Sequence, residues 1–509
     1  MPMKLIRKSK LYKPTHQRLH ATIYSVLAAL IQKLFHVLGT GTEFQKNWHI
    51  EAIAWHLQQV EKGKFTRLII NVGPRYLKSF SVSVVYPIWV LGRDPSKKII
   101  CISYSEDLAL LFSRMRRSAM ESSFVQLAFP KLKLDRRKLT EKEIVTTKGG
   151  GIYVTSVGGT LTGRGADILI IDDPMKAEGA YSDAERNKVH EWFTGTALSR
   201  LNDKKNGVII IVAQRVHDDD LCGRLLEHSA DEWTHLDLPA IAEKDEEIEI
   251  GDGKTYSRKI GEALHPERES IETLEKIKWE IGSANFAAQY QQRPIPPTGQ
   301  TFKAEWFQRF DLTEDISSFT LIIQSWDTAA GIGENNAYSA CTTWSIVEGR
   351  LVLLDVVRKQ LDFPTLIKFV ESHASKFSAD LVLVEEASSG IQVVQQMQQS
   401  SDHHVVGIKP IGEKLGRAMN ASVLVEQGLV YVPNEAPWLN DFLAEVLKFP
   451  QVKFKDQVDS MSQFLNWWLE RGNRKLAVRV RTLNGGTTKI SYQDSYYRRT
   501  GIPTLPDDY

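Results

Sequence analysis

Short runs of β-branched and aliphatic residues alternate with longer, helix-like stretches through the first half of the chain. This rhythm predicts a mostly parallel β-sheet that is covered by helices on both faces. The helix-like stretches are Glu106–Met120 and Ala184–Arg200, and the strand-like runs are Leu68–Val72, Ile99–Tyr104, Ile152–Val157, Ile168–Ile171 and Val208–Val212.

A different pattern opens the second half. Strand-like runs follow one another, and a short glycine-containing connection of hairpin length joins two of them. A helix-like stretch, a further strand candidate and mostly helical patterns come next. Antiparallel strands followed by strands interleaved with helices are the order of an RNase H-like domain. In chain order the segments are Leu321–Trp326, Ser339–Val347, Leu351–Val357, Pro364–Phe377, Leu381–Val384 and 390–469.

Composition narrows the class of protein. The chain has 509 residues, with 64 Lys and Arg against 62 Asp and Glu, so its formal net charge of +2 favours no particular partner. Cys101, Cys222 and Cys341 are too far apart for a disulfide scaffold or a cysteine-rich zinc site, and they fit a reducing cytoplasm. The apolar stretch Ile23–Leu38 is interrupted by polar residues, so neither membrane embedding nor secretion is expected. Basic residues gather at both ends of the chain, where they could contact phosphate backbones or form solvated tails.

The strand-like run Leu68–Val72 leads into Gly-Pro-Arg-Tyr-Leu-Lys-Ser, residues 73–79. A phosphate-binding loop needs this context, because backbone N–H groups and a helix N-terminus must face phosphate oxygens beside a lysine and a Mg²⁺-binding hydroxyl. Lys78 and Ser79 stand where those two roles require them, whereas Leu77 replaces the usual glycine. Taken alone, the heptapeptide is also compatible with a simple strand-to-helix turn.

Two further apolar strands end in polar residues. Asp172 and Asp173 follow Ile168–Ile171, and Gln214 and Arg215 follow the next strand. We assign Asp172 to a Mg²⁺ ion and Asp173 to activation of the attacking water, and Gln214 or Arg215 could sense the γ-phosphate. Polar groups delivered by three strands to one sheet edge predict an ATP-hydrolysing core. The alternative for the acids is an Asp-Asp-Pro turn without chemistry.

Acidic residues also end the strands of the second half. Asp327 ends its first strand, Glu385 ends its fourth, and Asp456 and Asp459 open a late helix. Two-metal cleavage of a phosphodiester needs carboxylates from distant positions to converge on their cations. The order predicts a nuclease site, and the third ligand stays open between Asp456 and Asp459 because a helix N-terminus favours both. Each acid taken alone is more often a solvated surface residue.

Two other clusters have plainer interpretations. Arg164, within the glycine-rich stretch 158–165, could act on the γ-phosphate of a neighbouring subunit or lie in an ordinary surface loop. The acids 218–220 follow His217 without a second histidine at ligand spacing, so we interpret them as the N-terminal acids of a helix over 221–227.

The prolines of Arg293–Gly299 forbid both helix and central strand, so this stretch is interpreted as an interdomain linker. Before it, the acidic stretch Glu243–Gly253 is predicted to be an exposed excursion. The expected organisation is a basic N-terminal segment (1–43), a P-loop ATPase domain (44–242), a connecting segment with linker (243–300), an RNase H-like nuclease domain (301–475) and a basic C-terminal tail (476–509).

From about Phe44 to Leu469 the chain resembles the large terminase subunit of tailed bacteriophages. The phosphate loop is similar to the family's Pro-Pro-Arg-x-x-Lys-Ser form, and the segments 160–174, 214–221 and 289–294 resemble its Walker B region, its coupling segment and the stretch before its nuclease. Lys455 stands where members commonly have another aspartate. By this resemblance the nucleotide-binding residues are Gly73, Arg75, Lys78, Ser79, Asp172 and Gln214, with Ser79 and Asp172 on the metal, and the nuclease acids are Asp327, Glu385, Asp456 and Asp459.

The resemblance implies a RecA-like (ASCE) P-loop ATPase joined to an RNase H-like nuclease. The implied activities are ATP-driven translocation of double-stranded DNA into the procapsid and Mg²⁺- or Mn²⁺-dependent endonucleolytic cutting of concatemeric DNA. The implied partners are a portal protein, a small terminase subunit and further copies of the chain on the portal, without a membrane. The implied location is the host cytoplasm, with transient docking on the procapsid.

Other classes fit the sequence less well. A helicase-nuclease of DNA repair or restriction is expected to carry a second RecA-like domain, and little room for one remains between Pro239 and the linker. A transposase or integrase triad typically ends in glutamate, whereas the last acids here are Asp456 and Asp459. A non-enzymatic scaffold with degenerate sites is suggested only by Leu77 and Lys455.

Overall fold

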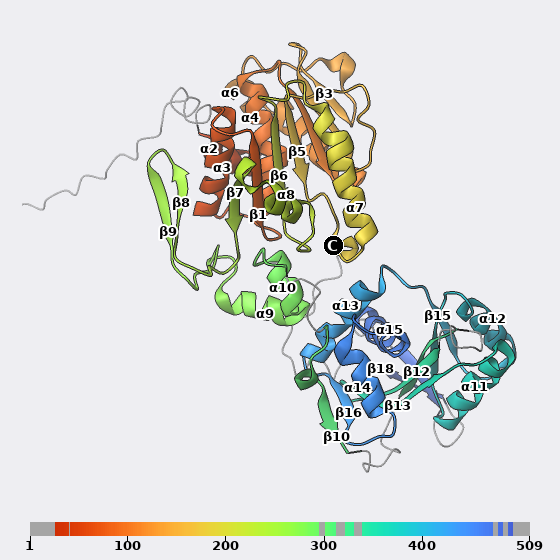
Figure 1. Cartoon of the computed structure of the whole chain (residues 1–509). Helices are drawn as coiled ribbons and strands as arrows, with labels where there is room; N and C mark the ends of the chain where they lie inside the picture. The colour runs from red at the N-terminus through yellow and green to blue at the C-terminus, as the bar shows by residue number, and fades with distance from the viewer. Residues whose placement is uncertain are drawn as a thin grey trace, which may run out of the picture. The chain divides into compact units, whose positions relative to one another are not determined.

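A computed structural model describes residues 26–39, 41–294, 301–311, 321–329 and 338–471, and the backbone of strands at 477–481 and 487–491. The chain forms two compact units, and each contains its own seven-stranded sheet (Figure 1). The first unit comprises Met1–Ile277 and Ala284–Ile295, and the second comprises Lys278–Ser283 and Pro296–Tyr509.

The sheet of the first unit has the strand order β3-β4-β2-β5-β6-β1-β7. Its strands are parallel, apart from β3, which runs antiparallel to β4. β6 lies between β1 and β5. The strands are β1 (Arg67–Val72), β2 (Lys98–Ser103), β3 (Glu143–Val145), β4 (Gly151–Ser156), β5 (Ile168–Asp172), β6 (Val208–Ala213) and β7 (Thr234–Leu238).

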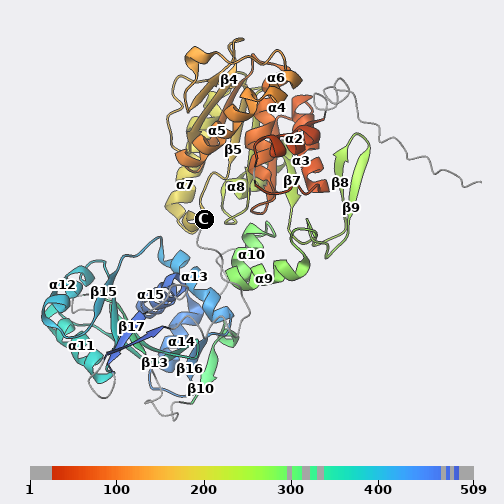
Figure 2. The same cartoon turned by 180° about the vertical axis from the view of Figure 1, so that it is seen from behind.

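Helices cover both faces of this sheet, because alternate residues of a buried strand point to opposite sides. Leu68 and Ile70 pack with residues of α2 to α6, whereas Ile69 packs with residues of α7 and α8. Figure 2 shows the helices of the first group over one face of the sheet. The helices are α2 (Leu27–Val37), α3 (Trp48–Glu61), α4 (Tyr86–Arg93), α5 (Glu106–Glu121), α6 (Ser123–Ala128), α7 (Asp183–Trp192) and α8 (Leu221–Ser229), with π-helices η1 (Phe80–Val85) and η4 (Phe193–Ala197).

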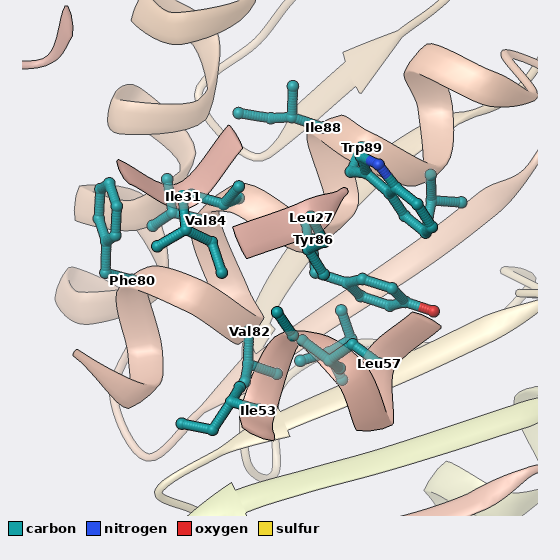
Figure 3. Packing of buried hydrophobic residues seen from close by; sticks show 14 of the residues in the cluster. Leu27, Ile31, Ile53, Leu57, Phe80, Val82, Val84, Tyr86, Ile88 and Trp89 are labelled. Atoms are coloured by element: carbon teal, nitrogen blue, oxygen red, sulfur yellow. The ribbon is translucent and has the colours of Figure 1, made fainter. Parts of the chain in front are cut away.

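The π-helix η1 is held in the hydrophobic core of the first face. Figure 3 shows Leu27 and Ile31 of α2 and Ile53 of α3 gathered around η1 side chains such as Val82 and Val84. All six residues of η1 are buried. The helical segment that follows the predicted phosphate loop is therefore fixed by apolar packing on the side away from the sheet.

The acidic stretch that was expected to be an exposed excursion forms a β-hairpin. β8 (Glu246–Gly251) and β9 (Lys254–Arg258) pair antiparallel. The hairpin packs on the first unit, because Ile248 is buried and Tyr256 stacks on Trp48 with ring centroids 4.5 Å apart. The helices α9 (Ile271–Ile281) and α10 (Ser283–Gln289) follow it in the chain.

The second unit has the strand order β10-β16-β13-β12-β11-β14-β15. β11, β12 and β13 are antiparallel neighbours, and β14 and β15 continue the sheet parallel to β11. This is the predicted RNase H-like order. The strands are β10 (Gln308–Phe310), β11 (Ile322–Asp327), β12 (Ser339–Val347), β13 (Arg350–Lys359), β14 (Leu381–Glu385), β15 (Val405–Ile408) and β16 (Val430–Pro433), and β17 (Ala477–Arg481) pairs with β18 (Thr487–Ser491).

Two groups of helices sandwich the second sheet. Trp326 and Val384 pack with α11 and α12 on one face, whereas Ile323 and Trp344 pack with α13, α14 and α15 on the other. The helices are α11 (Phe363–Lys376), α12 (Gly390–Ser400), α13 (Lys414–Glu426), α14 (Leu439–Lys448) and α15 (Asp456–Arg471).

The structure divides the chain differently from the expected boundaries. α2 lies within the segment expected to stand apart (1–43), yet Leu27, Leu30 and Leu34 are fully buried in the core of the first unit. Most of the expected connecting segment also belongs to that unit. The linker residues 295–300 and most of the C-terminal tail lie outside the described residues. No helix in the described part of the chain is long and apolar enough to cross a membrane.

Candidate functional site

The predicted nucleotide residues meet at the carboxyl edge of the first sheet. The phosphate loop follows β1, Asp172 ends β5 and Gln214 follows β6, and these three strands are parallel neighbours. Parallel strands end at the same sheet edge, so segments distant in sequence arrive at one place. Lys78 and Asp172 accordingly open onto the same site.

The phosphate loop adopts a backbone that usually requires glycine. Arg75 and Leu77 have φ angles of 67° and 58°, in the left-handed region. A non-glycine residue there costs roughly 1 kcal/mol or more. His49 Nε2 lies 3.2 Å from the carbonyl oxygen of Tyr76, and Arg268 donates a hydrogen bond to the carbonyl of Arg75. These contacts hold the loop, so Leu77 takes up the conformation for which a glycine is usual.

Lys78 is paired with the acid predicted to activate water. Its Nζ lies 2.9 Å from Oδ2 of Asp173, and the lysine side chain is largely buried. The other carboxylate oxygen of Asp173 accepts a hydrogen bond from the backbone N–H of Gln214 at 3.0 Å. The phosphate loop, the acid strand and the β6 strand are thus connected through one carboxylate.

Asp172 is the most deeply placed acid of this site, with 1% of its surface exposed. The hydroxyl of Ser79 donates to its Oδ1 at 2.9 Å. Burial and the neighbouring Asp173 carboxylate raise the pKa of Asp172 to about 7, against hydrogen bonds from Ser83 and Ser79 that lower it. A hydroxyl and a carboxylate beside a lysine form a donor set that fits Mg²⁺ with a nucleotide phosphate.

The two candidates for the γ-phosphate sensor, Gln214 and Arg215, differ in whether their side chains are already paired. Arg215 is occupied, because its Nε lies 2.9 and 3.0 Å from the two carboxylate oxygens of Asp220. Asp220 also caps α8 by accepting from the backbone N–H of Gly223 at 2.8 Å, so the acids after His217 open a helix, as expected. The side-chain oxygen of Gln214 is buried without a hydrogen-bond partner among the described residues.

Arg164 is also engaged within its own unit. Its guanidinium makes two hydrogen bonds to Glu143, at 2.7 and 3.3 Å, and lies 3.9 Å from the ring centroid of Tyr153. An action of Arg164 on a neighbouring subunit would require these contacts to break. The structure favours the plainer interpretation of its loop.

The predicted nuclease acids gather in the second unit. Asp327 and Glu385 end the parallel neighbours β11 and β14, whose register pairs the residues just before them. Asp456 and Asp459 lie in the first turn of α15, which packs against β11 and β12. Segments separated by more than a hundred residues are therefore brought to one sheet margin by strand pairing and helix packing.

Two cations of α13 hold these carboxylates. Arg417 Nη2 lies 3.4 Å from both Glu385 Oε2 and Asp459 Oδ1, and Lys414 donates a hydrogen bond to Asp459. Burial raises the pKa of Glu385, and Arg417 opposes that rise. The sequence interpretation did not include Lys414 or Arg417, since a lysine and an arginine three residues apart on a helix give no distinctive signal.

Burial raises the pKa of Asp327 to about 8, with the carboxylates of Asp459 and then Glu385 as the next causes. Asp456 contributes less to this shift, and one of its oxygens is buried without a partner in the described part of the chain. Electrostatics therefore favour Asp459 over Asp456 as the third member of the acid group.

Among the described residues, no three His, Cys, Asp or Glu side chains are placed so that they could already hold a metal ion. The donors nevertheless fit a hard dication by their chemistry, because they are carboxylate oxygens that repel one another, and the pKa values of Asp327 and Glu385 are raised. Asp327, Glu385 and Asp459 are the residues that would hold Mg²⁺ or Mn²⁺, once Lys414 and Arg417 release Glu385 and Asp459.

Comparison with known families finds a likeness within the second unit. The family model described as the terminase RNase H-like domain matches residues 324–467. This segment is therefore similar to that domain. All four predicted acids lie inside it, and so do Lys414 and Arg417.

Solved structures resemble the chain over most of its length. The large terminase of a thermophilic bacteriophage, in its second crystal form, matches with a TM-score of 0.52 and 11% identity, over 84% of this chain and 100% of that chain. The HK97 bacteriophage large terminase also matches, with a TM-score of 0.35 and 10% identity, over 87% of this chain and 99% of that chain. The large terminase nuclease of the thermophilic phage G20c with bound magnesium matches with a TM-score of 0.26 and 13% identity, over 34% of this chain and 98% of that chain. No curated protein sequence matches the chain.

At this level of identity, the first of these structures supports the fold alone. It confirms the predicted fold class, in which a P-loop α/β domain precedes the terminase RNase H-like domain. The expected resemblance to large terminases is thus confirmed for the architecture of the chain. The roles of single side chains remain predictions.

Proposed function

We propose that this chain is the large subunit of a phage terminase. It uses ATP hydrolysis to move double-stranded DNA into a procapsid, and it cuts concatemeric DNA with a divalent metal. The observation that carries the proposal is the presence in one chain of a terminase RNase H-like domain and of a phosphate loop whose Lys78 and Ser79 contact Asp173 and Asp172. A motor and a nuclease on one chain are what genome packaging with DNA cutting requires.

In the first unit, Lys78 binds the β- and γ-phosphates of ATP, and Ser79 and Asp172 hold the Mg²⁺ ion, which neutralises charge on the transferred phosphoryl group. Gly73 and Arg75 complete the loop. Phosphate replaces Asp173 as the partner of Lys78, which frees this carboxylate to orient and deprotonate water. Asp173 also accepts a hydrogen bond from the backbone N–H of Gln214, so the exchange of partners at Lys78 is linked to the end of β6.

In the second unit, Asp327, Glu385 and Asp459 hold the divalent metal, with Asp456 beside them. A divalent metal held there would supply the activation of water and the stabilisation of the leaving oxygen that phosphodiester cleavage needs. Lys414 and Arg417 then lose their carboxylate partners. Cationic side chains at that position are suited to contact the phosphates of the DNA that is cut.

The proposal extends to partners and location. A translocating subunit must dock on the portal vertex of the procapsid, beside further copies of itself, and a small terminase subunit presents the DNA. All of these steps take place in the host cytoplasm. A helicase-nuclease of repair or restriction is the alternative. Such an enzyme is expected to have a second RecA-like domain, whereas the one phosphate loop in the described residues belongs to a single, mostly parallel sheet.

Two substitutions separate the two activities. Lys78→Ala should abolish DNA-stimulated ATP hydrolysis and leave metal-dependent cutting of plasmid DNA, whereas Asp327→Ala should abolish cutting and leave ATP hydrolysis. Lys97→Ala and Asp402→Ala, which change exposed residues of the respective units, serve as matched controls. Unchanged ATP turnover in the first variant, or persistent cutting in the second, would refute the corresponding site.

A further inference from the structure

Asp172 accepts a second hydroxyl besides that of the phosphate loop. Ser83 Oγ donates to Oδ2 of Asp172 at 2.5 Å, while Ser79 Oγ donates to Oδ1 at 2.9 Å. Ser83 lies four residues after Ser79, inside the π-helix η1. Both oxygens of the predicted metal-binding carboxylate are therefore held by hydroxyls from the helical segment that follows the loop.

Ser83 is itself fixed from its backbone side. The guanidinium of Arg116, on α5, donates a hydrogen bond to the Ser83 carbonyl. Arg116 is completely buried, and its Nε and Nη2 have no hydrogen-bond partner among the described residues. The buried arginine therefore anchors the backbone of η1 at Ser83.

We propose that Ser83 is a positioning residue of the nucleotide site, which orients the Asp172 carboxylate for the metal. This inference rests on the proposed ATP site. Ser79 has two roles there, because its hydroxyl both contacts Asp172 and is predicted to bind Mg²⁺. Ser83 has no second role, so it is the hydroxyl that keeps Asp172 in place when Ser79 turns to the metal. π-helical turns often occur at functional sites, and η1 brings Ser83 to face this carboxylate.

The chain contains a matched control for this role. Ser81 lies in the same π-helix, is completely buried, and has a hydroxyl without a hydrogen-bond partner in the described part of the chain. Ser81→Ala and Ser83→Ala thus remove the same atom from the same buried helix. They differ in whether that atom contacts Asp172.

The test measures binding rather than turnover. Equilibrium binding of a fluorescent ATP analogue is titrated with Mg²⁺ in the full-length chain. Ser83→Ala should raise the half-saturating Mg²⁺ concentration about tenfold, equivalent to ~1.4 kcal/mol, while the affinity measured in EDTA stays at the wild-type value. Ser81→Ala should leave both quantities unchanged.

The outcomes separate this inference from the proposed function. If the wild-type chain does not bind the nucleotide in Mg²⁺, the ATP site itself is wrong. If it binds but Ser83→Ala has the wild-type Mg²⁺ midpoint, or Ser81→Ala shifts the midpoint equally, the role of Ser83 is overturned. Should the alanine variant fail to fold, Ser83→Cys keeps nearly the same volume with a weak donor, and a wild-type midpoint in that variant overturns the inference in the same way.

Discussion

Asp327 offers a test of the nuclease site that needs neither DNA nor catalysis. Its carboxyl is protonated in the folded chain up to about pH 8, compared with an ordinary value of 3.8. Because folding raises the pKa of this carboxyl, its ionised form destabilises the folded state relative to the unfolded state. That cost is absent below about pH 4, where both states are protonated, grows as the pH rises, and is complete above about pH 8.

The magnitude follows from the same values. At ~1.4 kcal/mol per pKa unit, the rise from 3.8 to about 8 corresponds to about 6 kcal/mol if nothing relaxes. Asp327 is partly exposed to solvent, and effective dielectric constants near 20 describe such sites. We therefore expect Asp327→Asn, an uncharged substitution of the same shape, to stabilise the second unit by about 2–3 kcal/mol at pH 9 and to have almost no effect at pH 4.

The assay is urea unfolding of the full-length chain in EDTA, followed by tryptophan fluorescence at several pH values, with Asp402→Asn as an exposed control in the same unit. Addition of Mg²⁺ should then stabilise the wild type and leave Asp327→Asn almost unaffected, because the metal offsets the carboxylate repulsion that the variant lacks. A stability difference that does not change between pH 4 and pH 9 would refute the reasoning about the acid group.

Three further predictions concern the contacts around both sites. Asp173→Asn should retain ATP binding but lower ATP turnover at least a hundredfold, as measured by phosphate release, because the general base is lost; turnover near the wild-type rate contradicts its role. Lys414→Met leaves Asp459 without its ammonium partner, so the gain in melting temperature on adding Mg²⁺ should be larger than in the wild type; an equal or smaller gain argues against competition between lysine and metal. Asp220→Ala removes the cap of α8 and the carboxylate partner of Arg215. It should lower the free energy of unfolding in urea by about 2–4 kcal/mol. A decrease below about 1 kcal/mol would show that other contacts hold the turn.

The sequence predicted the strands that carry the sites more reliably than the shortest strands of the second sheet. β1, β5 and β6 are continuous runs of buried aliphatic residues, which is the pattern of a central parallel strand. β15 and β16 were not predicted, and a mostly helical segment was expected there. Each has only four residues and is incompletely buried, so neither length nor hydrophobicity distinguishes it from a loop between helices.

Local pattern could place the acids at strand ends, but it could not supply their partners. Ser83, Lys414 and Arg417 reach the carboxylates only because helices pack at particular rotations on each sheet, and helix rotation depends on contacts across the whole core. The π-turn at η1 is a further example, since its register decides which serine faces Asp172.

By itself, the sequence determined the two-domain α/β architecture and the residues at its sheet margins, because strand and helix periodicities and polar strand ends are local properties of the chain. The tertiary structure alone decided how those residues are held: Lys78 on Asp173, two serine hydroxyls on Asp172, and α13 cations on the nuclease acids. These pairings join segments far apart in sequence, and their geometry is fixed by side-chain packing, which a hydrophobic pattern does not encode.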